Sequence, residues 1–373
     1  MEVLNRRLLV VTGKGGVGKT TVASALAWQA ASIGKRVLMC ELDAKGDLLA
    51  SLQGVSARAS APLTFAPREV YPRLHAMVMD PEESLKEYLR IYLRLPLITR
   101  VGLLSNAFDF LANAAPGVRE IVTIGKVAHE VRERRYDIVV VDATASGHIV
   151  GLLRAPQAIN ELVQAGLLRS QTAWILDILG DPKLTGVVAV ATPEELPVSE
   201  TADLFSNLTT QTNVSVQTVV VNRVLPAPFT QLESLEFAAV RQGLDLSPIG
   251  AEPQASRRSA GGPPKRTVGS GGSSGLGGSG VSGGSGGGGN VTDLEVGSGL
   301  AAGLAGLGER ESAFLVRGVG LAEDLRNESL QHLAALRTIA GSVPVAFVAQ
   351  LFGVSTGLPA TMAVARMLSE ELS

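Results

Sequence analysis

Residues 7–21 read RLLVVTGKGGVGKTT, and this stretch decides the fold. An apolar run from Arg7 to Thr12 is typical of a buried strand, and the segment after it matches the pattern G-x-x-x-x-G-K-[ST]. Glycines let a backbone wrap around phosphates, and the helix that follows presents its positive N-terminal end to them. The sequence therefore predicts a phosphate-binding loop formed by Gly13, Lys14, Gly15, Gly16, Val17, Gly18, Lys19, Thr20 and Thr21. In such a loop Lys19 is expected to reach the β- and γ-phosphates and Thr20 to bind Mg²⁺.

Short apolar runs alternate with helical patterns on either side of this loop. Further strands are predicted over residues 36–42, 74–79, 137–141, 187–191, 216–221 and, near the end of the chain, 342–351. Strands that are apolar throughout are typical of parallel sheets buried on both faces. We therefore predict an α/β fold with a doubly wound, mostly parallel sheet. The spacing of Val22, Leu26, Ala30 and Ile33 predicts the first helix, which ends at Gly34.

Glycine content and helical patterns suggest how the chain is organised. Residues 261–300 hold 17 of the 42 glycines, a composition that cannot bury enough surface to fold. We expect a core over residues 1–259, a flexible insertion over 260–300, and a helix–strand–helix segment over 310–373 that completes the core. Residues 80–135 carry no strand pattern and predict a helical insertion. Its stripe of Ile121, Ile124, Val127, Ala128 and Val131 either packs on the core or lines an exposed groove.

Composition argues against several classes of protein. With 33 basic and 35 acidic side chains the net charge is −2, so we expect no nucleic-acid partner. The apolar runs fall short of the roughly 20 residues that span a bilayer, which predicts no integral membrane segment. The start of the chain lacks the pattern of a secretory peptide, and a cytoplasmic location is expected. Cys40 is the one cysteine and cannot form a multi-cysteine metal site.

Lys14 adds to the general loop pattern. The run GKGGVGKTT resembles the deviant phosphate loop of the class that contains MinD, ParA, the nitrogenase iron protein and the arsenical pump ATPase. In that class the additional lysine reaches across a dimer interface to the phosphates of the partner subunit. The resemblance thus implies a dimer in which two subunits enclose ATP.

Further segments narrow the resemblance. Residues 41–48 (ELDAKGDL) and 142–148 (DATASGH) are similar to the two switch motifs of the arsenical pump-driving ATPase family, D-P-A-H-x-L and D-T-A-P-T-G-H. Residues 193–201 (PEELPVSET) resemble its P-E-x-L-x-x-x-E-T motif, and residues 221–223 (VNR) its adenine-binding motif. That family includes the ATPase that delivers tail-anchored membrane proteins. The run APGVREIVTIGK at residues 115–126 is most similar to actinobacterial members.

The resemblance implies roles for particular residues. Asp43 would orient the attacking water, and the lysines Lys14 and Lys19 would act on the phosphates. Mg²⁺ would be held by Thr20, Asp43 and Asp142, and ATP by the phosphate loop together with Pro193, Glu194, Asn222 and Arg223. His148 matches the second switch, although a lone histidine is more often a loop hydrogen-bonding residue. The residues Ala44, Gly46 and Ala145 depart from the family's switch motifs, which bears on the coupling of hydrolysis to shape change.

Three functions are consistent with these observations. The first is a dimeric, Mg-dependent ATPase switch that acts on a client protein or a membrane transport partner, as a homodimer or a heterodimer with a paralogue. The second is a small-molecule synthetase or kinase, against which Lys14 argues. The third is a positioning ATPase like MinD or ParA. A MinD-like membrane helix needs basic flanks, whereas the last helix carries Glu370 and Glu371 against Arg366.

Overall fold

The computed structural model describes residues 1–43, 46–52, 62–92, 117–162, 167–227, 229–243, 307–353 and 357–373. These residues form two compact units. The first contains Met1–Pro226 and Leu325–Ser373, and the second contains Ala227–Asp324. The predicted insertion at 260–300 and the middle of the predicted helical insertion, residues 93–116, lie outside the described residues.

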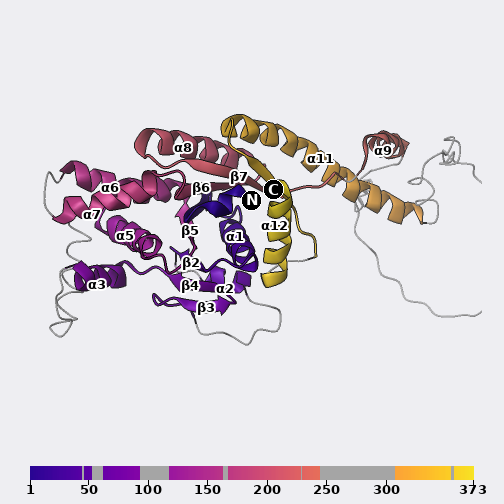
Figure 1. Cartoon of the computed structure of the whole chain (residues 1–373). Coiled ribbons are helices and arrows are strands. Elements are labelled where there is room, and N and C mark those ends of the chain that lie inside the picture. The colour runs from indigo at the N-terminus through magenta and orange to yellow at the C-terminus, as the bar shows by residue number, and fades with distance from the viewer. Residues whose placement is uncertain are drawn as a thin grey trace, which may run out of the picture. The chain divides into compact units, whose positions relative to one another are not determined.

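The first unit is built on a sheet of eight strands in the order β3-β4-β2-β5-β1-β6-β7-β8 (Figure 1). The strands are β1 (Leu8–Gly13), β2 (Val37–Glu41), β3 (Arg68–Tyr71), β4 (Leu74–Val78), β5 (Ile138–Ala145), β6 (Thr185–Ala191), β7 (Val216–Val224) and β8 (Val345–Ala349). All neighbours pair in parallel except β3, which is antiparallel to β4. The predicted α/β fold is confirmed. The strand β3 was not predicted, because its sequence REVY is only partly buried at the sheet edge.

Helices cover both faces of this sheet. One face carries α5 (Val118–Glu133), α6 (Ser146–Leu162), α7 (Leu167–Gly180), α8 (Glu195–Gln211) and the end of α11 (Glu309–Ala340). The other carries α1 (Lys19–Ser32), α2 (Asp47–Leu52) and α12 (Gly357–Glu371). Successive residues of β1 point to opposite faces, so Leu8 and Val10 join one core and Leu9 and Val11 the other. The remaining helices are η1 (Glu2–Asn5), α3 (Pro81–Tyr92) and, in the second unit, α9 (Gln231–Gly243).

The predicted helical stripes are mostly buried. The apolar stripe of α5 packs on the sheet, with Ile124, Val127, Ala128 and Val131 almost fully buried, so for this helix the core reading is confirmed. Asp80 caps α3, because its Oδ1 accepts hydrogen bonds from the backbone N–H groups of residues 82 and 83 at 2.8 and 3.1 Å. Within the described residues no helix is long and apolar enough to cross a membrane.

The last residue of the predicted first helix, Ile33, is not buried with the rest of its stripe. Ile33 is 58% exposed, because α1 ends at Ser32 and Ile33 follows as the C-cap with its side chain outside the core.

Candidate nucleotide site

The phosphate loop connects β1 directly to α1, as the sequence predicts. Gly13, Gly16 and Gly18 have φ values of +154°, +87° and +94°, which side chains rarely adopt. A Cβ on Gly13 would lie 2.0 Å from the carbonyl oxygen of Val190, so the loop begins in close contact with β6. The Lys19 Nζ donates to the carbonyl oxygen of Lys14 at 3.1 Å, which closes the loop on itself.

A cavity of about 1010 Å³ opens beside this loop at the carboxyl ends of the strands. Ten of the predicted site residues line it, together with His148: Gly15, Gly16, Gly18, Lys19, Thr20, Thr21, Asp43, Asp142, Asn222 and Arg223. The structure therefore brings most of the predicted nucleotide site into one space. Gly13, Lys14, Val17, Pro193 and Glu194 are not among the lining residues.

Thr20 and Asp142 form a hydrogen-bonded pair on the cavity wall. The Thr20 hydroxyl donates to Asp142 Oδ2 at 2.7 Å, while Oδ1 is buried without a hydrogen-bond partner. Burial raises the pKa of Asp142 to about 6, and the nearby carboxylates of Glu41 and Asp43 add to this against the opposing effects of Thr20 and Lys19. A buried carboxylate with one unsatisfied oxygen beside a hydroxyl has the hard oxygen donors that suit Mg²⁺. The described residues hold no cluster of three or more His, Cys, Asp or Glu side chains suited to a metal.

Lys14 turns away from the cavity toward α8. Its Nζ lies 2.9 Å from Glu200 Oε1, and the hydroxyl of Ser146 donates to Glu200 Oε2 at 2.8 Å. The hydrogen bond from Lys14, followed by that from Ser146, lowers the pKa of Glu200 against the effect of its partial burial. Glu200 therefore links the phosphate loop to the start of α6, within the second switch segment.

Comparison with known proteins identifies the family. A family model described as anion-transporting ATPase matches residues 6–172 and 168–247. The chain belongs to the anion-transporting ATPase family. It is 32% identical over 243 residues to ATPase BagA of Mycobacterium tuberculosis, which covers 64% of this chain and 70% of that protein. It is also 28% identical over 240 residues to an arsenical pump-driving ATPase of Escherichia coli, covering 58% of this chain and 39% of that protein. This member of the family is accordingly an enzyme that hydrolyses ATP.

In this ATPase Asn222 ties the end of β7 to the phosphate loop. Its Nδ2 donates to the carbonyl oxygen of Val17 at 2.8 Å, and its Oδ1 accepts from the backbone N–H of Arg223 at 2.9 Å. A Cβ on Gly18 would lie 2.3 Å from the same Nδ2. The Asn222 amide therefore fixes the loop as well as lining the cavity, a structural role that its motif did not predict.

Pro193 and Glu194 directly precede α8 and do not line the cavity. Pro193 is buried and Glu194 is exposed at the N-cap position of the helix. The residue of this motif that contacts the phosphate loop is Glu200, one and a half turns into α8, through its hydrogen bond from Lys14.

The ATPase cavity also has walls that the motifs did not predict. Arg119, Glu120 and Thr123 of α5 form one wall, and residues from the end of β8 and the start of α12, including Gln350 and Thr361, form another. The polar residues in APGVREIVTIGK were a sequence signal for the first wall. The second comes from a segment more than 120 residues after the last motif, and no local pattern connects it to the loop.

Proposed function

We propose that this ATPase hydrolyses Mg-ATP between two subunits, either two copies of this chain or this chain and a paralogue. We further propose that closure of the pair controls a client protein or a membrane transport partner. The observation that carries the proposal is the Thr20–Asp142 pair on the wall of the cavity beside the phosphate loop, with one buried carboxylate oxygen left unsatisfied.

The residues of the cavity can be assigned to steps of hydrolysis. Backbone N–H groups of the loop and Lys19 would bind the phosphates. Thr20 and Asp142, with Asp43 nearby, would hold Mg²⁺, which neutralises charge on the phosphates when bound. Asp43 follows β2, and Glu41 in that strand lies in register with Asp142 of β5. From that position Asp43 would orient the water that attacks the γ-phosphate, since this reaction depends mainly on positioning and charge.

Two observations support an active unit of two subunits. Lys14 is partly exposed and is held by Glu200 rather than in the cavity, so its amino group is available at the molecular surface once that pair opens. In addition, the matched region makes up 39% of the pump-driving relative, and a protein of that length has room for two such regions. Ligation of one nucleotide by lysines from two subunits would make ATP the contact between them.

The helix α5 supports coupling to a client. Its first turns contribute Arg119 and Thr123 to the cavity. On the same side of the helix lies Lys126, whose buried Nζ is 2.6 Å from Glu87 of α3 and 2.7 Å from Glu130. Displacement of α5 by nucleotide would thus be transmitted to α3, the described start of the helical insertion, because buried ion pairs resist separation.

ATP turnover and mass-resolved chromatography in Mg-ATP test this proposal. The wild type is compared with Asp43→Asn and Lys14→Ala. We expect turnover that Asp43→Asn abolishes without loss of ATP binding, a dimer that Lys14→Ala weakens, and loss of turnover with a chelator. ATP binding without a dimer or turnover would contradict the homodimer, and mixing with paralogues would then test the heterodimer.

A further inference from the structure

Basic residues precede five neighbouring strands. They lie where these parallel strands begin, at the end of the sheet opposite the nucleotide cavity. They are Arg7 before β1, Arg36 before β2, Arg73 before β4, Arg134 before β5 and Lys183 before β6. These strands are adjacent in the order β4-β2-β5-β1-β6 and run in parallel, so their amino ends share one edge. At about 4.8 Å between strands, the five positions extend over roughly 20 Å. We call these five residues the basic edge.

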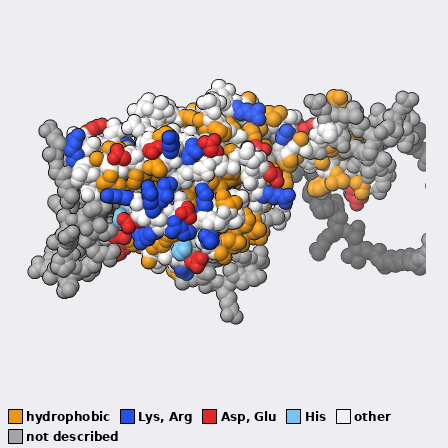
Figure 2. Space-filling model, viewed as in Figure 1, with side chains coloured by type: hydrophobic (Ala, Val, Ile, Leu, Met, Phe, Trp, Pro, Cys, Tyr) orange, Lys and Arg blue, Asp and Glu red, His pale blue; other side chains and the backbone are white. Residues whose placement is uncertain are grey.

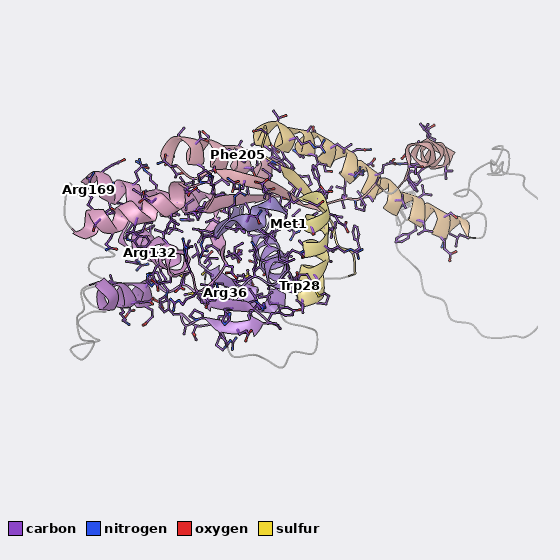
Figure 3. All side chains as sticks on the ribbon, in the orientation of Figure 1. Met1, Trp28, Arg36, Arg132, Arg169 and Phe205 are labelled. Carbon is purple, nitrogen blue, oxygen red and sulfur yellow. The ribbon has the colours of Figure 1, made fainter. Side chains whose placement is uncertain are left out.

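The charge on this edge is concentrated despite the chain's net charge of −2. Figure 2 shows Lys and Arg side chains gathered near the middle of the face toward the viewer, and Figure 3 labels Arg36 and Arg132 in this region. Asp137 pairs with Arg36 at 2.8 Å. Burial, then the like charge of Arg134, lowers the pKa of the Arg7 guanidinium. Glu69, Glu133 and Asp181 lie close in the chain to Arg73, Arg134 and Lys183, so with Asp137 four carboxylates face the five cations of the basic edge.

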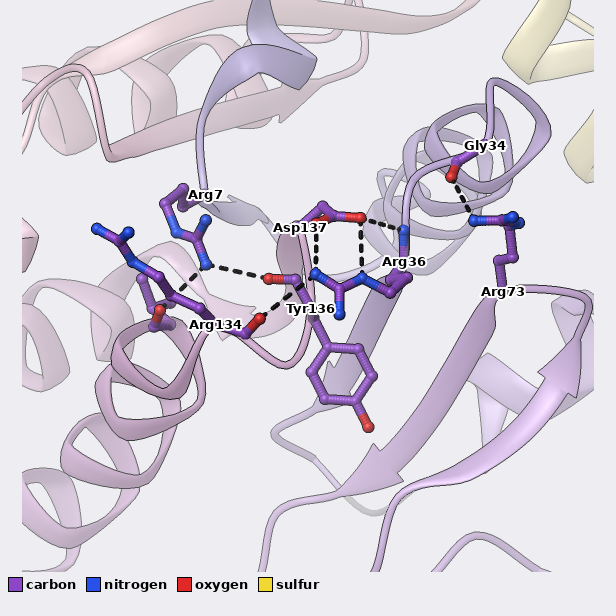
Figure 4. A network of polar contacts seen from close by, with 8 residues as sticks. Arg7, Gly34, Arg36, Arg73, Arg134, Tyr136 and Asp137 are labelled. Carbon is purple, nitrogen blue, oxygen red and sulfur yellow. Dashed lines mark hydrogen bonds and ion pairs between the residues drawn. The ribbon is translucent and has the colours of Figure 1, made fainter.

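Part of this edge has a structural role. Arg7 donates to the carbonyl oxygens of Val131 and Tyr136, and Arg73 to that of Gly34, all near the C-terminal ends of helices or in the loops that follow (Figure 4). Such contacts complement helix dipoles. They do not account for Arg134 and Lys183, whose exposed side chains make no hydrogen bond or ion pair with the described residues.

Two of these cations occupy backbone positions that favour glycine. Arg73 and Arg134 have φ values of +65° and +55°, and Arg134 directly follows α5, where glycine commonly ends a helix. A side chain in this conformation is strained. Arg73 and Arg134 therefore each place a cation at a position where glycine would be less strained.

Apolar and aromatic side chains lie at one end of the basic edge. The rings of Trp28 and Tyr71 are 6.3 Å apart, and Tyr71 is two residues from Arg73. Both side chains pack against the core and are partly exposed at the surface. Ile33 is 58% exposed next to Gly34, the residue whose carbonyl oxygen Arg73 contacts. Trp and Tyr beside basic residues and an exposed aliphatic side chain are the composition of surfaces that lie at the membrane–water interface.

We propose that the basic edge, together with Trp28, Ile33 and Tyr71, binds peripherally to a bilayer that contains anionic phospholipids. The guanidinium groups would contact headgroup phosphates, which they can bind with two hydrogen bonds each. A bilayer is favoured over single-stranded nucleic acid because the aromatic rings cluster at one end and do not alternate with the cations to stack successive bases. The nucleotide cavity lies at the opposite edge of the sheet and would remain open. Binding to the bilayer would require neither dimerisation nor ATP turnover.

Vesicle flotation and tryptophan fluorescence test this inference with the full chain. The chain has two tryptophans, so Trp174→Phe leaves Trp28 as the sole reporter. Vesicles of phosphatidylcholine alone are compared with vesicles that contain about 30% phosphatidylglycerol. We expect binding to the anionic vesicles only, a blue shift of Trp28 emission, and weaker binding as salt increases.

Charge variants test whether the basic edge is responsible for binding to anionic vesicles. The triple variant Arg73→Gln, Arg134→Gln, Lys183→Gln should lower affinity for anionic vesicles at least tenfold. Its matched control, Arg154→Gln, Arg169→Gln, Arg366→Gln, removes the same charge from other exposed positions and should bind like the wild type. Equal loss in both variants, or equal binding to neutral vesicles, would overturn the proposal. Binding to a single-stranded oligonucleotide without binding to anionic vesicles would also overturn it.

Discussion

Lys14 forms an ion pair with Glu200 of its own subunit, with 2.9 Å between Nζ and Oε1. The two residues are 186 positions apart, and Ser146 of the second switch segment contacts the same carboxylate. If Lys14 acts on the phosphates of a partner subunit, it must first leave Glu200. In that case the pair would oppose closure in the absence of nucleotide.

Glu200→Gln should make it easier for Lys14 to leave its intrasubunit partner. Both side chains are partly exposed, at 28% and 37%, so the pair contributes no more than about 1 kcal/mol. We expect the half-saturating ATP concentration for turnover to fall about two- to fivefold with little change in melting temperature. In the Lys14→Ala background the same substitution should have no effect. A fall of the same size in that background would show that Glu200 acts through another residue.

Gly13 and Gly16 offer a matched pair for testing the loop. A Cβ on Gly13 would overlap the carbonyl oxygen of Val190, whereas nothing lies within 4 Å of a Cβ on Gly16. Gly16→Ala should lower the free energy of unfolding by only about 1–2 kcal/mol, because alanine must adopt the positive φ of this position. Gly13→Ala should lower it clearly more, because β1 and β6 must separate to make room for the new methyl group. Urea unfolding of the two variants measures the difference, and equal costs would contradict close packing at Gly13.

Features that depend on a local sequence pattern were predicted correctly. The phosphate loop, the buried strands and most site residues lie in contiguous motifs, and the structure brings ten of those residues to one cavity. The Lys14–Glu200 pair was not predicted, although both residues were in recognised motifs, because the contact depends on how α8 packs beside the loop.

The buried polar contacts of α5 were likewise not predicted from the sequence. The apolar stripe of this helix was predicted, but the polar residues Thr123, Lys126 and Glu130 are buried beside it. Spacing alone would place a lysine and a glutamate in solvent. Their burial depends on Glu87 from α3 and on Phe65, whose ring lies 5.1 Å from the Lys126 Nζ.

Lys126→Met should destabilise the protein by about 3 kcal/mol, since it removes the buried ammonium from Glu87 and leaves the buried carboxylate of Glu130 paired only with the largely exposed Arg135. Adding Glu87→Gln and Glu130→Gln should recover most of that loss. Urea unfolding of the single and triple variants provides the measurement. If the triple variant is no more stable than the single one, packing around Lys126 rather than charge is the cause.

The pKa of Asp142 predicts a pH dependence of stability for the metal-free protein. Burial raises this pKa from 3.8 to about 6, so the folded state binds the proton more tightly than the unfolded state. Stability should then fall as pH rises from about 4 through 6, by on the order of 3 kcal/mol from this group. Asp142→Asn removes the buried charge and can still accept the hydrogen bond from Thr20.

Urea unfolding in the presence of a chelator measures the stability of the wild type and of Asp142→Asn as a function of pH. At pH 7.5 Asp142→Asn should be more stable than the wild type by about 2–3 kcal/mol, and near pH 4 the two should converge because the wild-type carboxyl is then neutral. The same substitution should abolish the Mg²⁺ dependence of ATP binding, since the amide cannot supply the negative charge that the cation needs. A stability difference that is equal at pH 4 and pH 7.5 would mean that Asp142 is not buried as a charged group.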